Sequence, residues 1–155
     1  MPNIEVTYLD NTSRIFKSFE DIIHHERVTC IDCSYQEICT LPESMNFPEL
    51  VNFDCSNNLL NRMPDKLNLP KLKHINCEYN SLQNIDVLFT LPKIEEVICY
   101  SNFINTLPDT YNLCPNLHFL YCNDNRIPFL PESLIHLCSQ GRGIICIGNP
   151  CYNSN

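Results

Sequence analysis

Apolar residues recur along the chain at intervals of 22 to 24 residues, which divides most of it into six similar units. The units start at Val28, Leu50, Leu72, Ile94, Leu117 and Gly141. Three positions later each unit has a second apolar residue, namely Ile31, Phe53, Ile75, Val97, Leu120 and Ile144. Around these positions apolar and other residues alternate. This alternation predicts one short strand with a single buried face in each unit.

Two further positions repeat with the strands, a cysteine and then an amide residue. The cysteines are Cys33, Cys55, Cys77, Cys99, Cys122 and Cys146. Three positions further on stand Gln36, Asn58, Asn80, Asn102, Asn125 and Asn149. We expect the cysteines to fill the core as small apolar residues. An amide side chain donates and accepts, so stacked copies can satisfy backbone groups that would otherwise be buried unpaired. Gln36 is one methylene longer and is expected to fit less well.

Prolines mark the other half of most units. An apolar residue precedes proline at Leu41-Pro42, Met63-Pro64, Leu107-Pro108 and Leu130-Pro131, and Asp86 replaces the proline of the third unit. Proline fixes φ and disfavours a helical conformation in the residue before it. We therefore expect these connecting arcs to be extended or to form short turns rather than full helices.

The repeating pattern resembles the leucine-rich repeat family, L-x-x-L-x-L-x-x-N-x-L, with cysteine at the position where the third leucine is common. The resemblance covers residues 28–151. It implies an α/β fold, a leucine-rich-repeat solenoid with a parallel β-sheet on its concave face and an irregular or 3-10 convex arc. It also implies a protein-recognition module that binds its partner on the concave sheet.

The chain is predicted to be a single domain with an N-terminal cap at 1–27, repeats at 28–151 and a C-terminal tail at 152–155. In the cap, Ile4, Val6 and Tyr8 alternate before a polar turn and a second strand, which predicts a β-hairpin. Ser18 and Asp21 resemble a capping box, which predicts a short helix through residue 24. A divergent additional repeat is the alternative for this segment.

The last predicted strand, residues 144–147, is the most apolar in the chain, and no following segment is expected to cover it. An uncovered apolar edge strand promotes association. Either the parent protein is longer, or this C-terminal edge pairs with another copy in a weak homodimer.

Composition narrows the function classes. A net charge of −8 argues against nucleic acid as the partner. No apolar run approaches the ~20 residues of a membrane span, so no membrane partner is expected. No basic leader is visible at the N-terminus, which favours a reducing, intracellular location in the cytoplasm for a chain with 11 cysteines, unless a leader has been removed.

No arrangement of residues indicates catalysis. The chain lacks the G-x-S-x-G, H-E-x-x-H and P-loop motifs, and no nucleophile, base and oxyanion donor can be assembled from it. Cys30 and Cys33 have C-x-x-C spacing, but strand alternation places them on opposite faces. We expect no metal, no cofactor and no enzyme activity.

The sheet face opposite the cysteines is the predicted binding surface. Its early units supply acidic groups and its later units supply aromatic ones. The candidate binding residues are Asp32, Asp54, His74, Glu78, Glu96, Tyr100, Phe119 and Tyr121. Such a surface suits another protein that presents a basic group beside an apolar anchor. The alternatives are a solvated face whose tyrosines only pack across strands, a structural or oligomerising scaffold, and an adaptor fragment of a larger protein.

Overall fold

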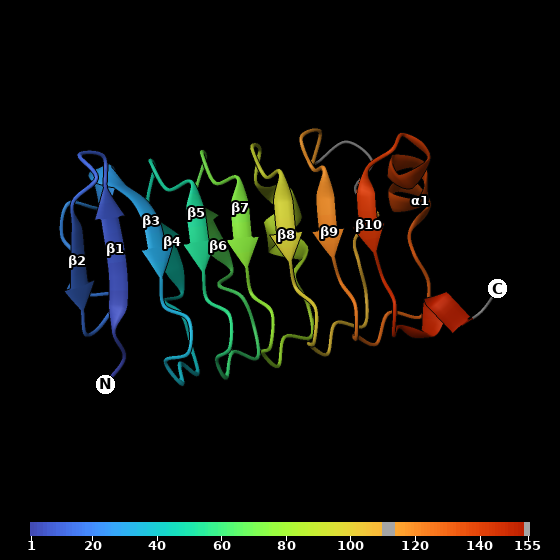
Figure 1. Ribbon diagram of the computed structural model, residues 1–155, viewed down its shortest axis with the longest axis horizontal. Helices are drawn as coiled ribbons and strands as arrows, with labels where there is room; N and C mark the ends of the chain where they lie inside the picture. The colour runs from blue at the N-terminus through green and yellow to red at the C-terminus, as the bar shows by residue number, and fades with distance from the viewer. Residues whose placement is uncertain (110–113, 154–155) are drawn as a thin grey trace.

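The computed structural model describes residues 1–109 and 114–153, and it has a mixed α/β fold with few helices. Most of its strands belong to one eight-stranded sheet, in the order β10-β9-β8-β7-β5-β3-β1-β2. Figure 1 shows these strands side by side in one row, with the N-terminus at one end and α1 at the other.

Each of the six units contributes one strand to this sheet. The strands are β3 (Val28–Asp32), β5 (Asn52–Asp54), β7 (His74–Asn76), β8 (Glu96–Ile98), β9 (Phe119–Tyr121) and β10 (Gly143–Ile145). Neighbouring strands pair in parallel and in register, so that Ile31 lies opposite Phe53 and Leu120 lies opposite Ile144. The predicted parallel sheet is therefore confirmed.

The repeated cysteines point into the core behind this sheet. Cys33, Cys55, Cys77, Cys99 and Cys122 are at most 1% exposed, whereas Cys146 in the last unit is only partly buried. The backbone N–H of each buried cysteine donates to the next unit, as from Cys55 to Asn76 O at 2.8 Å. All 11 cysteines are free thiols.

A ladder of asparagine side chains joins the units just beyond the strands. Asn80 Nδ2 donates to Cys55 O at 3.0 Å and to Cys77 O at 3.2 Å, and Asn80 Oδ1 accepts from Leu60 N at 2.9 Å. The same three kinds of bond recur at Asn58, Asn102, Asn125 and Asn149. One buried side chain thus satisfies backbone groups of two units.

Gln36, at the first position of this ladder, does more than imitate asparagine. Its Nε2 donates to Ser34 O at 2.9 Å, and its Oε1 accepts from the backbone N–H of Asn3 at 2.6 Å. The extra methylene lets the amide reach the N-terminal segment, where an asparagine would fall short. Gln36 therefore links the repeats to the segment predicted as their cap.

The N-terminal segment adds two strands to the sheet, the first of which runs opposite to the strands of the repeats. β1 (Ile4–Tyr8) pairs antiparallel with β2 (Ser13–Phe16), which is the predicted hairpin, and on its other side with β3. Ile4 and Val6 are buried against the first unit. The apolar end of that unit is covered in this way.

The helix predicted from Ser18 through residue 24 is wrong. Residues 17–21 form bends and a turn, and the only helical element of this segment is the 3-10 helix η1 (His25–Arg27). Ser18 Oγ bonds Asp21 Oδ2 at 3.0 Å, but His24 has φ 55, in the left-handed region that ends a right-handed helix. So short a segment also gains too few hydrogen bonds to nucleate a helix by itself.

Most connecting arcs are extended or form single turns, as the prolines predict. β4 (Ser44–Asn46) and β6 (Lys66–Asn68) pair as a second, two-stranded parallel sheet, behind the main one in Figure 1. η2 (Asp86–Thr90) is a 3-10 helix in the unit that lacks the first proline.

The last arc departs from this expectation, because it contains the α-helix α1 (Glu132–Ser139). Pro131 precedes the helix, where its fixed φ is tolerated, and no second proline follows before Gly141. Beyond β10, η3 (Pro150–Asn153) includes part of the predicted tail, and residues 154–155 lie outside the described residues. Within the described ranges no helix is long and apolar enough to cross a membrane.

Replacing Asn80 by alanine should lower the free energy of unfolding by about 1–3 kcal/mol, because buried backbone groups of two units lose their partners. Chemical denaturation monitored by circular dichroism measures the change. Asn61→Ala, at an exposed asparagine outside the ladder, is the matched control and should change stability little. Equal stability of the two variants would contradict the role given to the ladder.

Candidate functional site

The candidate site is the sheet face opposite the cysteine column, which we call the open face. Strand pairing arranges it in two rows that cross the units. One row contains Cys30, Asn52, His74, Glu96, Phe119 and Gly143, and the other contains Asp32, Asp54, Asn76, Ile98, Tyr121 and Ile145. No residue of either row is buried, whereas the strand residues between them, such as Ile31 and Phe53, are buried in the first five units and Ile144 in the last is half-buried.

The structure places all eight candidate binding residues on the open face or at its edge. Asp32, Asp54, His74, Glu96, Phe119 and Tyr121 belong to the two rows. Glu78 and Tyr100 come two residues after the ends of β7 and β8. Asp32 and Phe119 are exposed, and the other six are half-buried. The acidic residues gather at one end of the face and the aromatic ones at the other.

The two aspartates also have a local structural role that the sequence analysis missed. Asp32 Oδ1 accepts from Ser34 N and Asp54 Oδ1 from Ser56 N, both at 2.9 Å. Asn76 Oδ1 accepts from Glu78 N at 3.2 Å in the same way. These bonds close the turn after each strand, a habit of Asp and Asn residues. The sequence Asp-Cys-Ser, which recurs in two successive units, could have indicated this turn-closing role.

A shallow depression of about 290 Å³ lies on the open face over the first four units. Phe53 and Ile75 are among its lining residues, together with polar groups from Asp32, Asp54 and His74. His74 Nδ1 lies 3.3 Å from Glu96 Oε2, and the two form an ion pair when the imidazole is protonated. The depression thus presents carboxylates around a partly apolar base.

Tyr100 and Glu78 interact beside this depression. The Glu78 carboxylate accepts a hydrogen bond from the Tyr100 hydroxyl and, together with partial burial, raises the pKa of Tyr100 to about 12. Tyr79 packs edge-on against Tyr100 with 5.3 Å between ring centroids. Tyr79 is exposed and was not among the predicted binding residues. It adds a second phenol to this part of the face.

Phe119 and Tyr121 form the aromatic end of the open face. Their rings are stacked, with centroids 6.2 Å apart and 11° between the planes. The ring of Phe119 lies over Gly143, where a Cβ atom would come within 2.7 Å of Phe119 Cδ1. Tyr100 and Tyr121 thus each pack against another ring, Tyr79 and Phe119 respectively.

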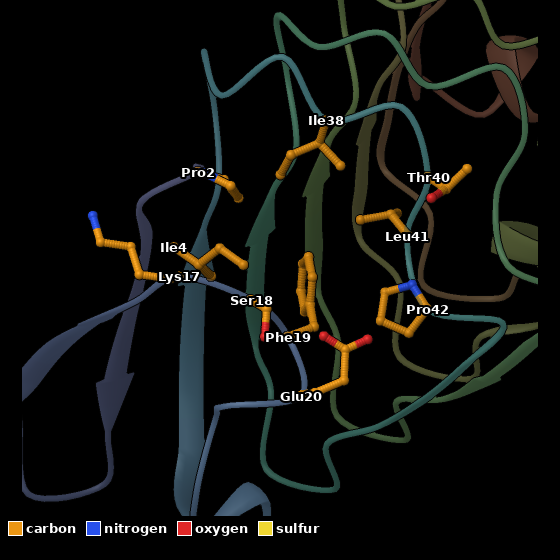
Figure 2. Close-up of a pocket in the computed structure, with 10 residues that line it drawn as sticks. All are labelled: Pro2, Ile4, Lys17, Ser18, Phe19, Glu20, Ile38, Thr40, Leu41 and Pro42. Atoms are coloured by element: carbon orange, nitrogen blue, oxygen red, sulfur yellow. The ribbon is translucent and has the colours of Figure 1, made fainter.

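A second depression, of about 310 Å³, lies where the N-terminal segment meets the arc of the first unit. Figure 2 shows the ring of Phe19 between Ile4 on one side and Leu41 and Pro42 on the other. Lys17 and Glu20 are also among the residues that line it. The lining is mainly apolar, and Phe19 and Ile4 are buried parts of the core. This pocket therefore marks the contact between the N-terminal segment and the first unit.

The thiols and carboxylates do not form a metal site within the described residues, where no group of three or more His, Cys, Asp or Glu side chains is placed to hold an ion. Cys30, the thiol on the open face, is half-buried. Burial, followed by the charges of Asp32, Glu5 and Asp54, raises its pKa. Cys30 is therefore a poor nucleophile at neutral pH.

Neither a protein-family model nor a curated protein matches the chain. The resemblance to leucine-rich repeats therefore rests on the repeated residues themselves.

Glu78→Gln should lower the pKa of Tyr100 from about 12 toward the ordinary value of 10.0, because the negative charge that opposes the phenolate is removed. Titration of Tyr100 by NMR of ring-labelled tyrosine, with Tyr100→Phe used for assignment, measures the shift. Glu132→Gln removes an exposed carboxylate of α1 instead and should leave the titration of Tyr100 unchanged. An unaltered Tyr100 titration in Glu78→Gln would show that the two side chains do not interact.

Proposed function

We propose that the chain is a leucine-rich-repeat solenoid that acts as a non-catalytic recognition module, binding a partner protein on the open face as its concave side. One observation carries this proposal: acidic side chains and a stacked aromatic pair share one exposed sheet face, on strands in fixed register. The partner segment presents Lys or Arg beside an apolar anchor.

The acidic half of the face supports a cationic partner. Among the described residues, neither Asp32 nor Asp54 forms an ion pair within the chain. Each carboxylate uses one oxygen to close its turn, and Asp54 Oδ2 also accepts from Asn76 Nδ2 at 3.3 Å, but both keep their charge on the open face. A basic side chain in the depression would meet several carboxylates at once, which favours encounter and orientation of the partner.

The aromatic half supports an apolar anchor beside the basic group. Phe119, the first residue of β9, is 47% exposed, and Tyr121 stacks on it. Exposed aromatic side chains with few rotatable bonds are typical of the residues that dominate binding energy. The surface is also rigid, because the asparagine ladder holds the strands, so that binding orders little of this chain.

We also propose a cellular location from the cysteine content. We place the protein in the reducing cytoplasm, because all 11 cysteines are free and five of them form a buried column that needs no disulfide.

Selection of a random peptide library on the immobilised protein tests the proposal. We expect enrichment of peptides with Lys or Arg next to Phe, Leu or Met. Asp32→Asn with Asp54→Asn should weaken binding of a selected peptide by about tenfold, because it removes two charges. Asparagine keeps the oxygen that closes each turn, as Asn76 already shows, so the fold should persist.

Phe119→Ser with Tyr121→Ser should reduce binding through loss of the apolar contact while leaving the preference for basic residues. The matched control is Phe129→Ser, which removes an exposed aromatic ring outside the open face and should bind like the original protein. A library with no common sequence after selection, or equal binding by all variants, would refute recognition by this face.

Self-association is a second candidate function, favoured by the C-terminal edge of the sheet. β10 is the last strand in the row, and Ile145 and Ile147 at this edge are exposed. Natural sheets usually protect such an edge with charges, bulges or a covering element. A weak homodimer of two β10 edges would cover these isoleucines.

Sedimentation across a wide range of concentrations tests this second candidate. The original protein should show a monomer–dimer equilibrium, and Ile145→Lys should shift it to the monomer by placing a charge at the edge. Ile15→Lys, at an exposed isoleucine of β2 on the opposite edge, should leave the equilibrium unchanged. A protein that remains monomeric at every concentration would remove this candidate.

A further inference from the structure

The last unit has cysteine at two positions that face the core, and this distinguishes it from the other five. In those units the residue five positions after the column cysteine is Ile38, Leu60, Leu82, Ile104 or Ile127. In the last unit it is Cys151, five positions after Cys146. Among the six units, this is the one with cysteine at both of these core-facing positions.

After burial, Cys151 is the neighbour that most affects the pKa of Cys146, so the two side chains lie next to each other at this end of the fold. Cys146 directly follows β10, and Cys151 lies in η3, so the chain turns back between them through Asn149. Both side chains pack against the core as partly buried residues. Asn149 holds this turn by donating to Cys122 O at 2.8 Å and Cys146 O at 3.0 Å.

Accessibility separates this pair from the buried column. Cys33 through Cys122 in the column are at most 1% exposed, whereas Cys146 and Cys151 are open to solvent in part. Cys138 of α1 is the third thiol of the same end, next to the backbone amide of Ile144. Reagents in solution can therefore reach this end but not the thiols behind it.

We propose that Cys146 and Cys151 are a thiol pair that a small-molecule disulfide, such as oxidised glutathione, converts to an intrachain disulfide. One cysteine thiolate attacks a glutathione sulfur, forms a mixed disulfide and releases one glutathione thiolate. The second cysteine thiolate attacks the mixed disulfide and releases the other glutathione. The two protein thiols lose two electrons to glutathione disulfide, and their two protons go to the released thiolates.

The surroundings of the pair determine its rate of reaction. Burial and the neighbouring Cys151 raise the pKa of Cys146, and burial raises that of Cys138. Cys122, whose pKa burial raises to about 12, is the other titratable group beside them. Since the thiolate is the attacking form, oxidation should be slow at neutral pH and faster in mildly alkaline buffer.

The bond would close the terminal turn of the repeats. The end units of a stacked array have only one neighbour and open most easily. A link from the end of β10 to η3 holds the turn that positions Asn149, whose side chain joins the last two units. Oxidation should therefore slow amide hydrogen exchange in residues 144–149. This consequence is independent of any partner on the open face.

Tryptic mapping tests the pairing directly. The folded protein is incubated with oxidised glutathione in mildly alkaline buffer, free thiols are alkylated, and the protein is digested. Cleavage after Arg126 and Arg142 separates peptide 127–142, which contains Cys138, from peptide 143–155, which contains Cys146 and Cys151. We expect peptide 143–155 to lose two hydrogen atoms and to carry no alkyl group. Alkylation or stable glutathionylation of both its cysteines, or its linkage to peptide 127–142, would overturn the proposal.

Two control variants and an oxidation in denaturant test whether the fold directs the pairing of Cys146 with Cys151. Cys151→Leu introduces the residue type of the other units, so it should fold and leave Cys146 available for alkylation or for glutathione. Cys39→Ser removes an exposed thiol elsewhere and should leave the yield of the disulfide unchanged. Oxidation in denaturant should spread among several pairings, and an equal yield of the 146–151 bond there would show that the fold does not direct it.

Discussion

The asparagine ladder is the interaction on which the rest of the structure depends. Each side chain spans two units, because its Nδ2 group donates to carbonyl oxygens of both and its Oδ1 atom accepts from the unit before. A backbone shift of one residue between units would leave several buried polar groups without partners, which is costly in free energy. The ladder therefore fixes how each strand stands beside the next, and with it the rows that cross the open face.

Because the register of the strands is fixed, neighbouring units can carry different side chains at equivalent positions of the open face. The buried positions keep the same residue types, while the open positions vary freely. At the position of Asp32 and Asp54 the side chain both closes a turn and carries a charge, whereas Ile98 and Tyr121 at the same position do neither. Gly143 leaves room for the ring of Phe119, so even the absence of a side chain affects the surface.

The sequence predicted the features that depend on spacing, and it failed where a single side chain or dihedral angle decides. The parallel sheet followed from apolar positions recurring in step. The N-terminal helix did not form, because the left-handed conformation of His24 is not visible in a pattern of apolar residues. The reach of Gln36 to Asn3 and the pairing of Tyr79 with Tyr100 depend on rotamers and on neighbours distant in sequence, which spacing does not encode.

The first and last units of the sheet have different neighbours, and this difference decides which cysteines are accessible to reagents. At the N-terminal end an antiparallel strand covers the first unit. At the C-terminal end Pro150 stands where other units have an N–H that donates to the preceding unit, as Arg126 N does to Ile104 O. Cys151 N donates to Ile127 O instead, at 3.0 Å, and the chain leaves the repeat in η3. Cys146 and Cys151 stay partly exposed at this end, so cysteine fills the core of the preceding units but is chemically accessible in the last one.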